Sequence, residues 1–259
     1  MQPVVISAMS RKGGAGKTTL IRAMASAFVF NKKRVLLIDA DPNRALATWL
    51  ERSVARGTSS PLLSVVETIK MDELTRIVDE AFENESADFI LIDTPGIGGG
   101  WADTIALQSD LLVTPLILTR TDLEKSMETV TWYERLHERV SDPSQLPPHA
   151  VVITRFVVKG GNSVEPISLG QQELLTEIRT LMKPIPYPMR ERLAYQDMDN
   201  EGLLGERSAQ LKADENPLVR GRARRYDDAL HEAIVVTNAI LKRLGAASAG
   251  TTRTIKTEG

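Results

Sequence analysis

A glycine-rich segment near the N-terminus, MSRKGGAGKTT at residues 9–19, carries the groups that bind a polyphosphate. It follows an apolar run at 4–9 and precedes a helix-like stretch at 17–30. Glycines let backbone N–H groups turn towards an anion, and the first turn of a helix adds partial positive charge there. The Lys17 ammonium can reach the β- and γ-phosphates, and the Thr18 hydroxyl can ligate Mg²⁺. We therefore predict a strand–loop–helix that binds a nucleoside triphosphate with Mg²⁺.

The strict phosphate-loop pattern G-x-x-x-x-G-K-[ST] fails at its first position, which is Arg11. An ordinary glycine turn is the alternative, but these residues at fixed places should occur by chance on the order of once in several thousand chains. The segment from Lys12 to Thr19 resembles, residue for residue, the deviant Walker A motif K-G-G-x-G-K-[ST]-[ST] of the ParA/MinD superfamily. The predicted nucleotide-binding residues are Gly13, Gly14, Ala15, Gly16, Lys17, Thr18 and Thr19.

Carboxylates end two further apolar runs, LLIDADPN at 36–43 and FILIDTPG at 89–96. Open α/β sheets place ligand chemistry at the carboxyl ends of their strands. Asp93 resembles a Walker B aspartate and is expected to hold Mg²⁺, with a helix cap as the alternative. The first run resembles the D-x-D-P-Q switch of the superfamily, with Asn43 in place of glutamine. The resemblance implies that Asp41 positions or activates the attacking water and that Asp39 supports the Mg²⁺ shell.

Lys12 precedes the glycines, so it cannot reach the same phosphate oxygens by the route that Lys17 takes. In the ParA/MinD superfamily this lysine crosses to the nucleotide of a second subunit. The resemblance implies that Lys12 stabilises the negative charge of hydrolysis in trans, as an arginine finger does. It also implies a homodimer in the ATP-bound state. A solvated surface lysine is the alternative.

The adenine site is less readable from the sequence. The segments VVITR at 151–155 and PIPYPMRERLAY at 184–195 resemble those that flank the base in this superfamily. Loop or core packing is the alternative for each of them. The candidate adenine contacts are Thr154, Arg155, Pro186 and Met189.

These residues need a scaffold, and the sequence predicts an α/β fold with a doubly wound, mostly parallel twisted sheet flanked by helices. Six short β-branched runs are apolar almost throughout, which is typical of strands buried on both faces. Helix-like stretches alternate with them over about 200 residues. Strands are predicted at 4–9, 34–39, 63–68, 88–95, 111–118 and 150–156, and helices at 17–30, 43–55, 71–84, 121–140 and 168–182.

The C-terminal part has a different pattern. An amphipathic helix at 226–244 is expected to dock on the domain. We predict a single ATPase domain over 1–244 and a flexible tail over 245–259, which is small and polar. The ParA-like resemblance covers residues 1 to about 200.

The composition excludes several classes of protein. A net charge of −2 excludes a global polycation, and the lack of cysteine excludes disulfides, thiolate catalysis and Cys-ligated iron–sulfur or zinc sites. We read no signal peptide and no run of the roughly 18 apolar residues that span a bilayer. A cytoplasmic protein is therefore expected, and the ParA-like resemblance implies that it is associated with the nucleoid.

Non-specific DNA is the expected surface partner, because four arginines in six positions could contact phosphates without reading sequence. They are Arg220, Arg222, Arg224 and Arg225. A solvated loop is the alternative. MinD-like membrane binding is the less favoured reading, because the tail at 245–259 lacks a basic amphipathic helix.

The resemblance implies a slow, partner-stimulated ATP hydrolase that positions a plasmid, a chromosome or another DNA cargo. An adaptor or centromere-binding protein would stimulate hydrolysis, and the exposed faces of Trp132 and Tyr133 are a candidate partner site, with burial as the alternative. The segment at 188–204 is also similar to the ParA-like ATPase of T-DNA transfer systems, which brings a DNA–relaxase complex to a secretion channel. Recruitment of a relaxase-type partner is therefore the second candidate function.

Overall fold

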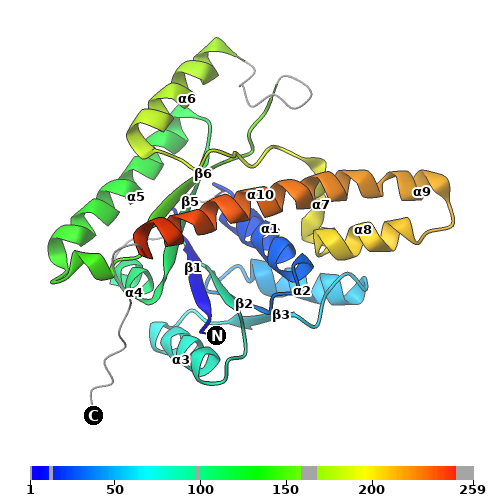
Figure 1. The fold of residues 1–259 in the computed structure, drawn as a ribbon, viewed down its shortest axis with the longest axis horizontal. Helices are drawn as coiled ribbons and strands as arrows, with labels where there is room; N and C mark the ends of the chain where they lie inside the picture. The colour runs from blue at the N-terminus through cyan, green and yellow to red at the C-terminus, as the bar shows by residue number, and fades with distance from the viewer. Residues whose placement is uncertain (1, 12–13, 97–99, 159–167, 249–259) are drawn as a thin grey trace.

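The computed structural model describes residues 2–11, 14–96, 100–158 and 168–248 (Figure 1). Within them a six-stranded sheet runs in the order β3-β2-β4-β1-β5-β6. Every neighbouring pair of strands is parallel. This confirms the predicted doubly wound α/β fold. The strands are β1 Val4–Ala8, β2 Val35–Asp39, β3 Leu63–Glu67, β4 Phe89–Asp93, β5 Leu111–Ile117 and β6 His149–Thr154.

Alternate residues of each central strand face opposite layers of helices, because side chains in a strand alternate with a period of two. In β4, Leu91 packs in the cluster that includes α1 (Lys17–Phe30), whereas Ile90 and Ile92 pack against α3 (Met71–Glu83). Both faces of the strand are thus buried, which explains the continuous apolar runs in the sequence.

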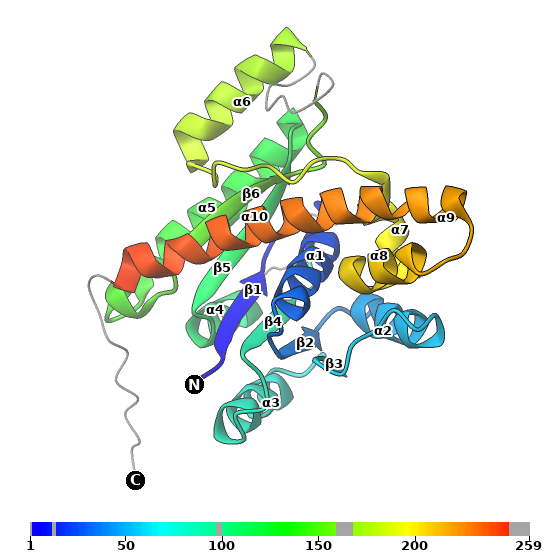
Figure 2. The ribbon, with the colours of Figure 1, turned by 45° about the vertical axis from the view of Figure 1, so that its right-hand side comes forward.

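The helices form one layer on each face of the sheet (Figures 1 and 2). The long α10 (Ala223–Ser248) crosses the same face as α1, and both contribute to the largest hydrophobic cluster. Apart from α1 and α3, the helices are α2 Ala45–Ala55, α4 Gly100–Gln108, α5 Arg120–Arg139, α6 Leu169–Met182, α7 Leu193–Glu201, α8 Leu204–Lys212, α9 Pro217–Gly221 and α10 Ala223–Ser248.

The C-terminal region is more helical than the sequence analysis expected. The predicted helix at 226–244 is part of α10, which extends beyond it at both ends, so the predicted domain boundary at residue 244 falls inside this helix. The remainder of the predicted tail lies outside the described residues. In the part of the chain described, no helix combines the length and the apolar character needed to cross a bilayer.

Candidate nucleotide-binding site

The glycine loop leads into α1, which begins at Lys17 as predicted. Gly14 and Gly16 have φ angles of +81° and +96°, in the left-handed region that favours glycine. A Cβ on Gly16 would lie 3.3 Å from Thr154 Oγ1, so a larger residue there would also crowd β6. The predicted residues Lys12 and Gly13 lie outside the described residues.

Thr18 and Asp93 meet at the end of β4, where the Thr18 hydroxyl donates a 2.6 Å hydrogen bond to Asp93 Oδ2. Asp93 is 1 % exposed, and within the described residues its buried Oδ1 has no hydrogen-bond partner. Burial raises the pKa of Asp93 to about 6, although the bond from Thr18 and the charge of Lys17 act in the opposite direction. A hydroxyl beside an unpartnered carboxylate oxygen is the donor set that Mg²⁺ takes beside phosphates.

These residues fit a shared Mg²⁺ site rather than an all-protein one. Among the described residues, no group of three or more acidic or histidine side chains could hold a metal ion. Mg²⁺ usually keeps several waters and binds one or two carboxylates together with substrate phosphates. Thr18 and Asp93 would hold the ion, directly or through water, and the ion would neutralise charge on the phosphates.

Lys17 lies within this acidic environment and is buried. Burial lowers the pKa of Lys17, and the charges of Asp93 and Asp41 act to raise it. The lysine thus has carboxylates as its electrostatic partners until an anion enters the site.

Asp39 and Asp41 occupy different positions at the end of β2. Asp39 is buried, and its Oδ2 accepts the backbone N–H groups of Leu46 at 2.8 Å and Ala47 at 3.1 Å. It therefore caps α2. Asp41 is half-buried and accepts both the backbone and the side-chain N–H groups of Asn43 through Oδ1. The metal role of Asp39 and the catalytic role of Asp41 stay predictions.

Of the four residues predicted to contact adenine, three line a cavity and one does not. A cavity of about 350 Å³ lies beside the glycine loop, and Thr154, Arg155 and Met189 line it together with Gly16 and Thr19. Thr154 also donates to the backbone oxygen of Ala15 at 3.0 Å, so it supports the loop itself. Pro186, by contrast, is exposed and does not line this cavity.

The segment that carries Met189 runs beside β6. Ile185 N–H donates to Val151 O at 2.9 Å, and Met189 N–H donates to Ile153 O at 2.8 Å. Arg155 has a φ of +48°, an uncommon conformation for a residue other than glycine, where β6 ends at the cavity. The predicted adenine segments are therefore neighbours in space, and base recognition by them stays a prediction.

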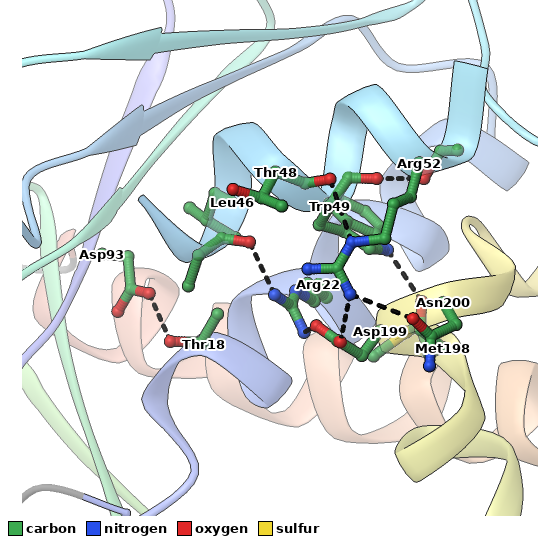
Figure 3. Close-up of polar contacts among 12 residues, drawn as sticks. Thr18, Arg22, Leu46, Thr48, Trp49, Arg52, Asp93, Met198, Asp199 and Asn200 are labelled. Atoms are coloured by element: carbon green, nitrogen blue, oxygen red, sulfur yellow. Dashed lines mark hydrogen bonds and ion pairs between the residues drawn. The ribbon is translucent and has the colours of Figure 1, made fainter. Parts of the chain in front are cut away.

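Sequence analysis missed Arg22, whose side chain lines the same cavity. Its Nη1 pairs with Asp199 Oδ1 at 2.6 Å, and its Nη2 donates to Ala45 O at 2.6 Å (Figure 3). An arginine within the otherwise small and apolar stretch LIRAMASAFVF is the signal that could have found it. Its partner Asp199 lies on α7, a helix that the sequence analysis did not predict.

The four predicted DNA-binding arginines lie where α9 ends and α10 begins, at the end of the molecule opposite the C-terminal end of α10 (Figure 1). Arg220, Arg222 and Arg224 are exposed. Arg225 pairs with Asp197 at 2.7 Å, and Arg220 donates to backbone oxygens of Asp214 and Glu215. The solvent-facing charge of this cluster therefore comes from Arg220, Arg222 and Arg224, and for Arg222 and Arg224 no side-chain hydrogen bond or ion pair restrains the guanidinium among the described contacts.

The candidate partner residues on α5 are half-buried rather than exposed. Trp132 Nε1 donates to Asp103 Oδ1 at 2.8 Å, and the Tyr133 hydroxyl donates to Pro147 O. Both side chains thus have internal partners, which favours the packing alternative.

The parallel sheet, the glycine loop before α1 and the buried aspartate at the end of β4 define a P-loop NTPase of the ParA/MinD type. The VirC1 protein family model matches residues 1–246, and the chain therefore belongs to the VirC1 family. It is 30 % identical to protein virC1 of Rhizobium radiobacter over 242 residues, covering 92 % of this chain and 97 % of that protein.

Solved structures share this fold. The ATP complex of a Cyanothece McdA variant matches with a TM-score of 0.62 and 16 % identity, over 91 % of this chain and 97 % of that one. A putative plasmid partition protein from Borrelia burgdorferi bound to AMPPNP matches with a TM-score of 0.55 and 15 % identity, over 89 % and 99 %. The ParA-like class is thus supported by both sequence and fold.

Proposed function

We propose that this chain is a slow, Mg²⁺-dependent ATPase that dimerises on ATP, binds DNA without strong sequence preference and recruits a DNA–protein cargo. The observation that carries the proposal is the pairing of Thr18 with buried Asp93 directly after the glycine loop. Two structures of the same fold hold ATP or AMPPNP, which supports an adenine nucleotide as the ligand. A steady-state assay with and without Mg²⁺ tests the enzymatic part, and no Mg²⁺-dependent phosphate release would contradict it.

We favour a DNA–relaxase complex as the cargo over a partitioning plasmid. Sequence similarity to the T-DNA transfer ATPase at 188–204 and the VirC1 family match over residues 1–246 support this choice. The test compares the rate of ATP hydrolysis in the presence of a relaxase with the rate in the presence of a centromere-binding adaptor. We expect the relaxase of the same transfer system to raise the rate severalfold, and stimulation by a partition adaptor alone would favour the other cargo.

We expect the Asp41→Ala variant to accumulate as a dimer in ATP and Mg²⁺. The variant should bind ATP through the intact loop but lack the residue proposed to position water, so the ATP-bound dimer should persist. Size-exclusion chromatography coupled to light scattering measures this, with ADP as the control nucleotide. A variant that stays monomeric in ATP would contradict ATP-dependent dimerisation.

We expect the double substitution Arg222→Ala and Arg224→Ala to weaken ATP-dependent binding to random-sequence DNA. The salt slope of log K should fall by about 0.9 for each phosphate that the protein no longer neutralises, so two arginines per subunit, which is four per ATP-bound dimer, give about 3.6. Binding is measured by fluorescence anisotropy at several salt concentrations. Arg76→Ala on α3 is the matched control, because it removes an exposed arginine elsewhere. Equal slopes for the double variant and the wild type would remove these arginines from the DNA site.

A further inference from the structure

Arg22 holds a buried charge beside the proposed nucleotide site. The residue is 7 % exposed, its guanidinium lies 5.6 Å from the centre of the Trp49 ring, and its Nε has no hydrogen-bond partner among the described residues. Burial of a charge is costly unless it is paired and hydrogen-bonded. Asp199 and Ala45 O supply those partners, and they come from two separate helices, α7 and α2.

The position of Arg22 on α1 connects it to the glycine loop. Thr18 and Arg22 are four residues apart, so they lie on the same face of the helix, one turn from each other. Thr18 contacts Asp93 at the end of β4, and Arg22 contacts Ala45 at the start of α2 (Figure 3). The helix that carries Lys17 thus contacts the end of β4 and the start of α2, the helix that follows the acidic segment after β2.

The segment that carries Asp41 lies between two fixed points. Asp39 ends β2 and holds the first amides of α2, while Arg22 holds the oxygen of Ala45. Few residues separate these points, and one of them, Arg44, has a left-handed φ of +53°. We therefore expect a shift of Ala45 relative to α1 to move Asp41 relative to the glycine loop, because the connecting segment is short.

We propose that Arg22 is a positioning residue for ATP hydrolysis, which fixes the start of α2 against α1 and thereby places Asp41 relative to the bound nucleotide. The proposal rests on the proposed ATPase function and on the water-positioning role of Asp41. Arg22 acts through the Asp41 segment, and its side chain also lines the cavity beside the glycine loop.

The competing explanation is that Arg22 only forms a structural ion pair between α1 and α7. A variant of Arg52 distinguishes this explanation from a positioning role. Arg52 Nη1 pairs with the other oxygen of Asp199 at 2.6 Å, but it does not line the cavity. Its described hydrogen bonds go to Thr48 O, Asp199 and Asn200 (Figure 3). Arg52→Met thus removes one partner of the same carboxylate and leaves the contact between Arg22 and Ala45 in place.

The first test compares ATP hydrolysis by Arg22→Met, Arg22→Lys and Arg52→Met with that of the wild type. We expect Arg22→Met to lower kcat about 10-fold with KM for ATP within about 3-fold, because misplacement of a group that acts on the reacting water affects the chemical step. Lysine can reach only one of the two partners of Arg22, so Arg22→Lys should have an intermediate kcat. Arg52→Met should stay within about 2-fold of wild type.

The second test needs no nucleotide. Hydrogen exchange at the amides of Leu46 and Ala47 reports whether the start of α2 is held. We expect about 10-fold faster exchange there in Arg22→Met than in both the wild type and Arg52→Met. If Arg22→Met does not yield folded protein, hydrogen exchange at the same two amides is measured in Arg22→Lys, where we also expect faster exchange than in the wild type.

The outcomes separate this proposal from the proposed function. Wild-type protein that does not hydrolyse ATP would contradict the ATPase function, while the exchange experiment would still test whether Arg22 holds α2. Unchanged exchange in Arg22→Met would overturn the positioning role. An equal loss of kcat in Arg22→Met and Arg52→Met would also overturn it, because a structural ion pair explains that result.

Discussion

We expect Asp93→Asn to abolish Mg²⁺-dependent ATP hydrolysis while it stabilises the nucleotide-free protein. Asparagine keeps an oxygen that can accept the Thr18 hydrogen bond, but it cannot provide the anionic oxygen that we propose for Mg²⁺. The loss of hydrolysis should be at least about 100-fold, as for removal of a group that stabilises transition-state charge. Phosphate release at saturating ATP and Mg²⁺ measures it.

The stabilisation follows from the cost of the buried charge. Burial raises the pKa of Asp93 from 3.8 to about 6, and a difference of one in pKa corresponds to about 1.4 kcal/mol. Removal of the charge also deprives the buried Lys17 of a carboxylate, which offsets part of this gain. We therefore expect the free energy of unfolding at pH 7 to rise by only about 1 kcal/mol. Urea denaturation without nucleotide measures it.

The difference in stability between Asp93→Asn and the wild type should change with pH in a defined direction. The folded protein binds a proton at Asp93 more tightly than the unfolded chain does, since its pKa is raised from 3.8 to about 6. This contribution to stability is complete below about pH 4 and is lost as pH rises to about 6. The advantage of Asp93→Asn over wild type should therefore grow across this interval and become constant above it.

Asp122→Asn is a suitable control for the pH experiment. Asp122 is also buried, but its carboxylate accepts the Thr119 hydroxyl and lies in the first turn of α5, where a negative charge is favourable. Its replacement should destabilise the protein. If Asp93→Asn also destabilises the nucleotide-free protein at every pH, the carboxylate of Asp93 is stabilising and the argument from its burial is wrong.

The sheet and the phosphate loop could be predicted from the sequence because each depends on local pattern. Val5 and Ile6 face opposite helix layers, so the strand is apolar throughout, and such strands are recognisable without knowledge of their neighbours. The glycine loop is recognisable because its backbone conformation demands particular residues at fixed spacing. The place of Asp93 at a strand end follows once these are found, whereas the order of the strands comes from the structure alone.

The short helices α4, α7, α8 and α9 could not be predicted in the same way, because tertiary packing rather than local preference stabilises short helices. The contact between Arg22 and Asp199 joins residues 177 positions apart, so no spacing in the sequence indicates it. The predicted metal role of Asp39 comes from a family resemblance, whereas its bonds to the amides of α2 depend on how α2 is oriented and have no signal in the sequence. The hydrogen-bond and ion-pair partners of the buried polar residues were thus the main feature that could not be predicted from the sequence.

Gly202→Ala should cause the largest loss of stability of any glycine-to-alanine change at the glycines described. Gly202 ends α7 with φ of +81° and ψ of −151°, a conformation that is almost restricted to glycine. A Cβ at this position would lie 2.3 Å from Thr58 Oγ1 and 3.0 Å from Ser53 Oγ. Both of those side chains are fully buried, so the chain near α2 and α7 would have to move.

We expect Gly202→Ala to lower the free energy of unfolding by about 4 kcal/mol, the sum of backbone strain of roughly 1–3 kcal/mol and an overpacking cost of similar size. Denaturant unfolding measures it, and Gly57→Ala separates the two causes. Gly57 has a φ of +67° but open space where its Cβ would stand, so it reports strain alone at about 1 kcal/mol. Gly170→Ala in α6 has neither problem and should be neutral or slightly stabilising.

The comparison also tests how α7 is held. Leu203 N–H donates to Thr58 O, and Met198 O accepts the Trp49 indole, so bonds on both sides of Gly202 fix the end of α7 to α2 and to the segment that follows α2. If Gly202→Ala costs no more than Gly57→Ala, this contact is loose enough to absorb a methyl group. Asp199 would then sit on a mobile helix, and Arg22 would have Ala45 O as its one firm partner. A cost of several kcal/mol would instead establish that α1, α2 and α7 form one rigid frame around the nucleotide cavity.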